Sequence, residues 1–129
     1  MLEFNIKSHT KNEFIDITNE IQKIITHSGV SDGICVLYVP HTTAGVTINE
    51  GADPDVQRDI LMMLNKLVPL KDDYTHMEGN SSAHIKSSLV GNSKTLIINK
   101  GSLVLGTWQA IFFCEFDGPR NRKLIINIS

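Results

Sequence analysis

Most of the chain is predicted to form short strands, because apolar side chains either alternate with polar ones or occur in short unbroken runs. Residues 2–6 and 124–128 place an apolar side chain at every second position, which is the period of a strand with one buried face. Residues 34–39 are apolar throughout, as expected of a strand that is central in its sheet or lies in a subunit interface. The predicted strands cover residues 2–6, 34–39, 44–49, 95–99, most of 103–116, and 124–128.

Two segments carry apolar side chains at helical spacing instead. In the first, isoleucines recur from residue 17 to residue 25, Thr18 or Asp16 can cap the start, and Gly29 can close the end. In the second, Asp53-Pro54-Asp55 fits the first positions of a helix. Its buried stripe is predicted to consist of Val56, Ile60, Leu64 and Leu67.

A polar segment separates the second helix from the final strands. Residues 70–82 are too many and too polar for a tight turn, which makes them a candidate functional loop. A short third helix is predicted over residues 83–90, capped by Ser81 or Ser82 and ended by Gly91. Strands outnumber helices, and the chain has neither a strand–helix–strand rhythm nor an internal repeat. The predicted fold is therefore α+β: a single domain, residues 1–129, built on a mostly antiparallel β-sandwich with two main helices and a short third helix.

The composition fits a folded domain and narrows the range of partners. Of the 129 residues, 41% are apolar and 20% are charged, which is ordinary globular usage. A net charge of −2 argues against nucleic acid as a partner. The start of the chain does not resemble a signal peptide and no apolar run has the length of a membrane span, so we expect a cytoplasmic protein with no membrane partner. Cys35 and Cys114 lie in apolar strands and are expected to be buried free thiols.

Three histidines stand at the ends of predicted elements. His41 follows a strand, and His76 and His84 flank the loop before the third helix. Three imidazoles are the ligand set of an open catalytic zinc site. Their spacing matches no zinc motif, however, and a single histidine is more often a surface residue or a hydrogen-bonded core residue. The pattern alone favours this second interpretation unless the fold brings the element ends together.

Charged side chains form a second group of candidates. Glu50 directly follows an apolar strand, where a carboxylate can bind a cation or take a proton. Asp53 and Asp55 are explained equally well as residues that cap a helix. Lys86 and Arg120 can pair with phosphate, although each alone is also typical of a solvated cation.

Two further features have both a structural and a functional interpretation. Residues 79–82 precede a helix, so their backbone N–H groups can hold a phosphate or simply belong to a capped loop. Trp108 lies on a mostly apolar strand face, which favours burial in the core over stacking on a flat substrate ring. Neither cysteine has a histidine in a known local signature, and no nucleophile elbow is present, so covalent catalysis has no support.

Four sequence blocks match those of a known family. They are residues 41–50 (HTTAGVTINE), 53–55 (DPD), 83–86 (AHIK) and 93–111. The last block is the most specific, because it matches the spacing of the family at many positions. These are Ser93, Leu96, Ile98, Gly101 and the Gly106-Thr-Trp-Gln109 stretch. With these blocks the chain resembles the YjbQ family, also called the secondary thiamine-phosphate synthase family, from the first strand to the last.

The resemblance implies a β-sandwich with flanking helices that assembles as a homotrimer, with polar clusters near the subunit boundaries. It also implies a divalent metal ion, zinc or magnesium, bound by His41, His76 and His84. The catalytic residues that it implies are Glu50, Asp53, Lys86 and Arg120. The substrate-binding residues that it implies are Thr42, Asn49, Asn80, Ser81, Trp108 and Gln109.

The activity that the resemblance implies joins hydroxymethylpyrimidine diphosphate to a thiazole phosphate, which forms thiamine phosphate and releases pyrophosphate. The expected partner is therefore a small phosphorylated substrate. Lys86 or Arg120 would neutralise the leaving pyrophosphate, and Trp108 would face the pyrimidine. Dedicated thiamine-phosphate synthases resemble a TIM barrel, a fold that this sequence does not predict, so the reaction can be a side activity. Two alternatives stay open: a metal-dependent hydrolase of a small phosphorylated compound, and a non-enzymatic module that binds a metal or a phosphorylated ligand.

Overall fold

Eight strands form two antiparallel sheets in the computed structural model, which describes every residue from Met1 to Ser129. The larger sheet has the order β1-β8-β3-β5-β6, formed by Leu2–Lys7, Asn121–Ile128, Gly33–Tyr38, Ser93–Asn99 and Ser102–Leu103. The smaller sheet has the order β2-β7-β4, formed by Glu13–Asp16, Gln109–Glu115 and Ala44–Glu50. Every pair of neighbouring strands is antiparallel, and the predicted α+β fold is confirmed.

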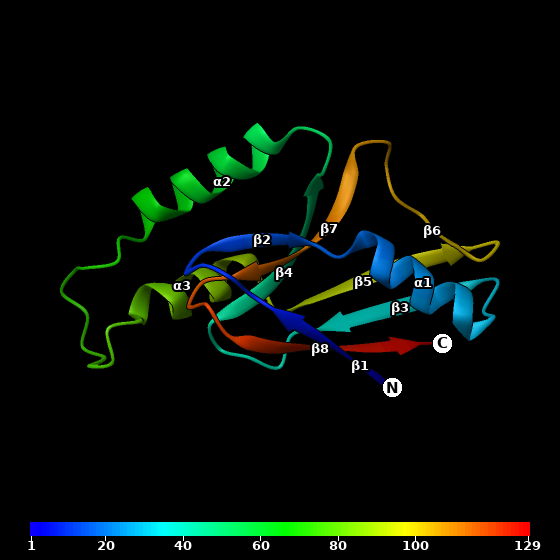
Figure 1. Cartoon of the computed structure of the whole chain (residues 1–129), viewed down its shortest axis with the longest axis horizontal. Coiled ribbons are helices and arrows are strands. Elements are labelled where there is room, and N and C mark those ends of the chain that lie inside the picture. Colours follow the sequence, from blue (N-terminus) through cyan, green and yellow to red (C-terminus); the bar gives the residue numbers. More distant parts are fainter.

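Three helices flank the sheets. They are α1, Thr18–Ser28; α2, Pro54–Leu67; and α3, Ser81–Val90. α1 lies against β6 and β7 at one end of the molecule, whereas α3 runs beside β4 at the other end (Figure 1). α2 lies on the outside, and the long loop that follows it leads into α3 (Figure 1).

The central strand of the small sheet, β7, is almost fully buried because its two faces enter two different cores. Ile111 and Phe113 point into the main core, which lies between the two sheets and α1. Phe112 points the other way, into a smaller core against which Leu61 and Leu64 of α2 pack. The small sheet is therefore the middle layer of the molecule, with the large sheet on one face and α2 and α3 on the other.

Local sequence signals start α2 and end α1 as predicted, whereas the N-cap position of α1 is Ile17 rather than Asp16 or Thr18. Asp53 caps α2, since its Oδ1 accepts a hydrogen bond from the backbone N–H of Asp55 at 2.9 Å. At the start of α1, Asp16 Oδ1 accepts a hydrogen bond from the backbone N–H of Thr18 at 2.9 Å. Gly29 ends α1 in the left-handed conformation, with a φ of 75°.

Several predicted boundaries are wrong. The sequence pattern does not predict β2, which has 4 residues, too few to establish a period. The segment 103–116 contains the end of β6, a loop and β7 rather than one long strand. α3 begins at Ser81, so that Ser81 and Ser82 lie inside the helix and Asn80 precedes it.

Exposure corrects two further predictions and qualifies a third. Leu67 is 68% exposed, and α2 has no fully buried residue because it packs only through one side of its middle, where Leu61 and Leu64 meet the smaller core. Trp108 is 64% exposed, so its predicted place in the core is wrong. β3 is central in the large sheet, as predicted, but its outer face is open in the single chain, where Ile34 is 43% exposed.

A buried ion pair joins the two sheets next to the start of β4. Arg122 of β8 donates from Nε to Glu115 Oε1 at 2.8 Å and from Nη2 to Glu115 Oε2 at 2.5 Å. Ser8 Oγ donates to Glu115 Oε1 at 2.7 Å, and Arg122 Nη2 donates to Thr43 Oγ1 at 2.7 Å. Burial alone would raise the pKa of the Glu115 carboxyl, but the hydrogen bonds from Arg122 and Ser8 lower it below its usual value. The network fixes the segment that carries His41.

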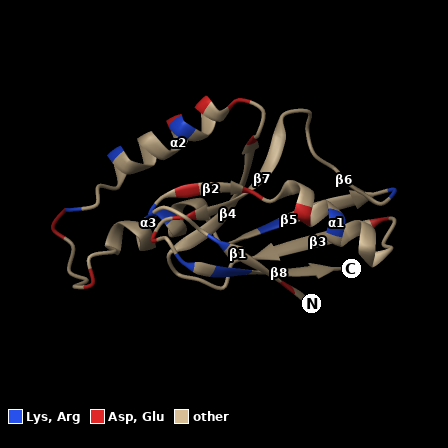
Figure 2. Ribbon diagram, viewed as in Figure 1, with Lys and Arg blue, Asp and Glu red and all other residues tan.

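The cysteines are placed as the sequence predicts. Cys35 and Cys114 are free and buried, and burial raises the pKa of the Cys35 thiol to about 11. Acidic and basic residues are interspersed along the ribbon (Figure 2). None of the helices has both the length and the apolar character needed to cross a membrane.

Candidate functional site

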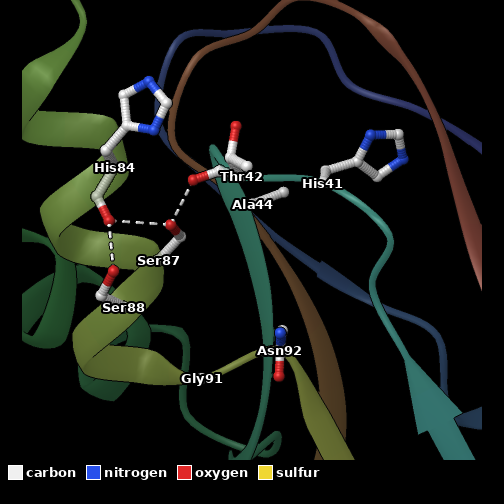
Figure 3. Close-up of a pocket in the computed structure, with 8 residues that line it drawn as sticks. All are labelled: His41, Thr42, Ala44, His84, Ser87, Ser88, Gly91 and Asn92. Atoms are coloured by element: carbon white, nitrogen blue, oxygen red, sulfur yellow. Dashed lines mark hydrogen bonds between the residues drawn. The ribbon is translucent and has the colours of Figure 1, made fainter.

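His84 of α3 lies between two cavities. The first, which we call the His41 cavity, has a volume of about 360 Å³ and separates α3 from the loop before β4. It is lined by His41, Thr42, Ala44, His84, Ser87, Ser88, Gly91 and Asn92. Ser87 Oγ donates to the Thr42 carbonyl at 2.5 Å, which ties α3 to the loop (Figure 3). The imidazoles of His41 and His84 lie on either side of Thr42 and do not face each other (Figure 3).

His41 is positioned as a neutral imidazole. The backbone N–H of Lys123 donates to His41 Nε2 at 3.0 Å. A ring nitrogen that accepts a hydrogen bond carries no proton, so the proton of the neutral ring is on Nδ1. Burial and then the positive charge of Arg122 lower the pKa of His41, which favours this neutral form. His41 therefore offers an N–H donor through Nδ1.

The second cavity, which we call the His76 cavity, lies on another side of His84 and has a volume of about 420 Å³. It is lined by Asp73, Tyr74, Thr75, His76, Ser81, His84 and Ile85. The rings of His76 and His84 have centroids 5.2 Å apart and meet edge to face. The loop that was predicted to be functional therefore places one of its histidines beside the first turns of α3.

His76 is oriented by a chain of side chains that ends at Asp117. Asn80 Nδ2 donates to Asp117 Oδ2 at 2.9 Å, which leaves Asn80 Oδ1 to accept from His76 Nε2 at 3.1 Å. His76 Nε2 then carries the ring proton, so Nδ1 keeps a free lone pair. Burial alone would raise the pKa of the Asp117 carboxyl, but the hydrogen bond from Asn80 and the charges of Arg120 and Lys11 together lower it. Asp117 is thus a stable anchor for the chain.

The first turn of α3 leaves several donors without partners. No side chain caps the helix, because the Asn80 side chain is engaged by His76 and Asp117. The backbone N–H groups of Ala83 and His84 donate to the Asn80 carbonyl, but those of Ser81 and Ser82 have no partner in the helix. Ser81 Oγ is also buried without a hydrogen-bond partner. Such a group of donors at a helix start suits an oxyanion.

The three histidines do not come together within one chain, and no group of three or more His, Cys, Asp or Glu side chains is arranged to hold a metal ion. His76 and His84 are neighbours, and the free Nδ1 of His76, with its other nitrogen hydrogen-bonded, resembles the arrangement of a metal-binding histidine. His41 does not fit the set, because its Nε2 already accepts the Lys123 N–H. A single chain thus offers two imidazoles rather than the predicted three.

Several predicted site residues lie at the far end of the small sheet. β4 begins beside α3 and ends at Glu50, which pairs with Gln109 of β7. A strand of this length spans roughly 20 Å, so these residues are far from both histidine cavities. Asn49 Oδ1 accepts from the Glu50 N–H at 2.7 Å, Gln109 accepts from a nearby backbone N–H, and Asp53 caps α2. Trp108 is exposed at this end.

The two predicted phosphate-pairing cations have other partners. Lys86 is two residues from His84, which turns it to the opposite side of α3, where it lines a third cavity. The guanidinium of Arg120 donates to the Asp117 carbonyl from Nε and to Asp117 Oδ2 from Nη2, both at 2.8 Å. None of the predicted catalytic residues lines either cavity that contains His84.

Sequence reasoning missed the residues that orient the histidines. Asp117 is not among the sequence-based candidates, and its partner Asn80 is 37 residues away in sequence. Arg122 was not singled out at all. One signal was available, since Glu115 is a charged residue inside an otherwise apolar strand and therefore needs a buried partner.

Comparison with known proteins places the chain among close relatives. Residues 2–129 match the family described as "UPF0047 protein YjbQ-like". A UPF0047 protein of Methanocaldococcus jannaschii is 56% identical over 128 residues, which cover 99% of this chain and 93% of the relative. The UPF0047 protein YugU of Bacillus subtilis is 49% identical over 124 residues, which cover 95% of this chain and 94% of the relative.

Solved structures agree with the sequence comparison. An uncharacterized conserved protein of the YjbQ/UPF0047 family from Clostridium acetobutylicum superimposes with a TM-score of 0.98 at 56% identity, and each chain covers 100% of the other. A conserved hypothetical protein from Thermus thermophilus superimposes with a TM-score of 0.93 at 38% identity, again with 100% coverage of both chains. The chain therefore belongs to the YjbQ-like UPF0047 family.

Proposed function

We propose that the chain binds a small phosphorylated substrate at the start of α3 and catalyses the transfer that forms thiamine phosphate. The observation that carries the proposal is the group of unpaired donors at Ser81 and Ser82, which lies beside the imidazoles of His76 and His84. The choice of reaction rests on the resemblance of the sequence blocks to the secondary thiamine-phosphate synthase family.

The helix dipole and the side chains both favour an anion at the start of α3. The start of a helix carries a partial positive charge, and free backbone N–H groups there bind phosphate oxygens directly. Ser81 adds a buried hydroxyl that has no partner in the protein. The volume of the His76 cavity, about 420 Å³, is in the range of small-molecule sites.

The proposed reaction requires little from the protein beyond charge and position. The methylene carbon of the pyrimidine exchanges its C–O bond to diphosphate for a C–N bond to the thiazole nitrogen, and the departing oxygen keeps the electron pair of the broken bond. Donors that face the departing pyrophosphate stabilise this charge. The start of α3 and a ring N–H of His84 would supply those donors, and the Nδ1–H of His41 would hold a polar group of the second substrate.

A divalent metal ion, zinc or magnesium, is a further part of the proposal. His76 and His84 would hold it, the remaining ligands would come from substrate phosphates or a partner subunit, and the ion would neutralise phosphate charge. The homotrimer is proposed on the same resemblance, and the open outer face of β3 and the exposed helix α2 are consistent with it. The roles proposed above for the start of α3, His84 and His41 require neither the metal ion nor the homotrimer.

The test is an assay of thiamine phosphate formation with the two purified substrates, with and without Zn²⁺ or Mg²⁺. We expect product with the wild-type chain and a rate lower by about 10²-fold or more in His84→Ala, because donors that stabilise departing charge contribute on that order. The matched control is His27→Ala, which changes an exposed histidine on α1. It should keep the wild-type rate.

The other outcomes separate the alternatives. Release of phosphate from the diphosphate alone, abolished in His84→Ala, would replace the synthase with a hydrolase. Binding of the diphosphate without turnover would leave a ligand-binding module. Equal rates in the wild type and His84→Ala would refute the assignment of the site.

A further inference from the structure

Lys86 is a buried cation for which the chain supplies no carboxylate partner. The residue is 4% exposed, and it takes part in none of the ion pairs of the chain. Its Nζ donates to Asn65 Oδ1 at 2.5 Å and to Asn12 Oδ1 at 3.2 Å. An ammonium group has three donors, so two neutral amide oxygens leave one donor unpaired. A buried charge in this condition is unfavourable until a negative group compensates it.

The surroundings of Lys86 provide space for such a group. Lys86 lines a cavity of about 240 Å³, which we call the Lys86 cavity, at the junction of α2, α3 and the loop before β2. It is lined by Lys11, Asn12, Asn65, Leu70, Ser82 and Lys86. Its wall thus carries two ammonium groups, two amides and a hydroxyl, with no carboxylate. Burial and then the charge of Lys11 lower the pKa of Lys86, so both its surroundings and its neighbour disfavour the charged form of Lys86.

We propose that the Lys86 cavity is a binding site for a small oxyanion of the phosphate class, held by Lys86, Lys11 and the Ser82 hydroxyl. The site goes beyond the proposed function, because it is separate from the phosphate position in the His76 cavity. Ser82 and Lys86 are four residues apart and share one side of α3, whereas Ser81 and His84 belong to another side. An anion here would pair the free donor of Lys86 and offset the repulsion between the two lysines.

A purely structural role is the alternative. Lys86 joins Asn65 of α2 to Asn12 of the β1–β2 loop, and a tie of this kind stabilises the fold without any ligand. The tie does not account for Lys11, which reaches Asp117 only at 3.6 Å and lines the same cavity. A structural role and an anion-binding role can therefore be tested separately, because the Lys11 side chain takes no part in the hydrogen bonds that join Asn65 to Asn12 through Lys86.

The test is calorimetric titration of the full chain with inorganic phosphate at constant ionic strength, in a His84→Ala, Ser81→Ala background that removes the side-chain donors of the His76 cavity. We expect phosphate binding to persist in this background. Adding Lys86→Met should weaken it by about tenfold or more, and adding Lys11→Met by roughly threefold, since a hydrogen-bonded charge contributes more than a partly solvated one. Lys66→Met, on exposed α2, should leave the dissociation constant unchanged.

Each remaining result would overturn the proposal. If phosphate binds equally well with and without Lys86→Met, the ion sits elsewhere. If the background variant binds no phosphate at millimolar concentration while the wild type does, the only anion site is the His76 cavity, and the proposed function survives alone. If Lys86→Met does not fold, Lys11→Met decides the question, because an unchanged dissociation constant in that variant contradicts a two-lysine site.

Discussion

Glu115 and Arg122 form the most deeply buried ion pair of the chain, and the segment that carries His41 is attached to it through Thr43. The carboxylate receives donors from Ser8 and Arg122 as well as from the backbone N–H groups of Phe116 and Asp117. A carboxylate saturated in this way stays ionised despite its burial. The position of His41 therefore depends on a charged residue that does not touch the cavity.

Glu115→Gln should destabilise the fold strongly, because it leaves the Arg122 guanidinium buried without a counter-charge. We expect a loss of roughly 3–5 kcal/mol in the free energy of unfolding, the usual cost of breaking a buried pair on one side. Urea denaturation followed by circular dichroism measures it. Glu3→Gln is the control, since Glu3 and Lys123 form an exposed pair at 3.5 Å that should contribute less than about 1 kcal/mol. Similar losses in the two variants would contradict the role assigned to the buried pair.

The same carboxylates predict how stability depends on pH. Hydrogen bonds and neighbouring cations hold the pKa values of Glu115 and Asp117 below their ordinary values in the folded chain, so the unfolded chain binds more protons in acid. Their contribution is complete above the ordinary carboxyl range and is lost as the pH falls from that range through the lowered pKa values of the folded chain. Denaturation midpoints measured from pH 6 down to pH 3 should therefore stay nearly level at first and then fall once the pH drops toward ordinary carboxyl values near 4. The fall should be shallower in Glu115→Gln, and an identical slope would show that Glu115 does not titrate abnormally.

At the scale of elements, the contact between β4 and α3 closes the His41 cavity and depends on a missing side chain. The Val46 N–H donates to the Gly91 carbonyl at 3.1 Å, which attaches the strand to the end of the helix. A Cβ on Gly45 would lie 2.6 Å from that carbonyl oxygen, closer than the atoms allow. The close approach is therefore possible only with glycine at position 45.

Gly45→Ala should push β4 and α3 apart. We expect a loss of about 1–3 kcal/mol in the free energy of unfolding, as for other overpacked sites, with weaker ligand binding in the His41 cavity. Gly106→Ala is the matched control, because there the nearest atoms, at 3.3 Å and beyond, belong to the flexible side chain of Gln109. Urea denaturation compares the two variants. Equal stability would mean that the strand and helix can separate without cost.

The sequence predicts elements well where a period or a cap acts locally. The alternation in β1 and β8 and the caps at Asp53 and Gly29 predict strands and helices close to those observed. β2 escapes prediction because it is short and is defined by its pairing with β7. The candidate site is predictable only in part. His76 and His84 can be recognised from the sequence of the loop and helix. The hydrogen bond between Asn80 and Asp117 cannot, because it depends on how distant segments pack.

At the scale of the whole molecule, the small sheet separates two groups of predicted site residues. His41 and His84 lie at the start of β4, whereas Glu50, Trp108 and Gln109 lie at its end. A cyclic trimer has interfaces that join two different patches of the chain, one from each neighbour. If the α3 end of one subunit meets the Trp108 end of the next, the two groups form one site at each boundary. This geometry would also cover Leu89 of α3, which is 62% exposed, and Trp108.

This arrangement makes a prediction that does not require the interface to be known. Light scattering should give a mass about three times that of the 14.3 kDa chain. His84→Ala and Trp108→Ala should each abolish substrate binding or turnover, because each removes one side of every site. Subunits of the two variants, mixed in equal amounts and allowed to exchange, should recover about a quarter of the wild-type sites, since a site is intact only where the two unaltered sides meet. No recovery on mixing, although exchange occurs, would contradict a site shared between subunits, and full activity of Trp108→Ala alone would show that Trp108 has no part in it.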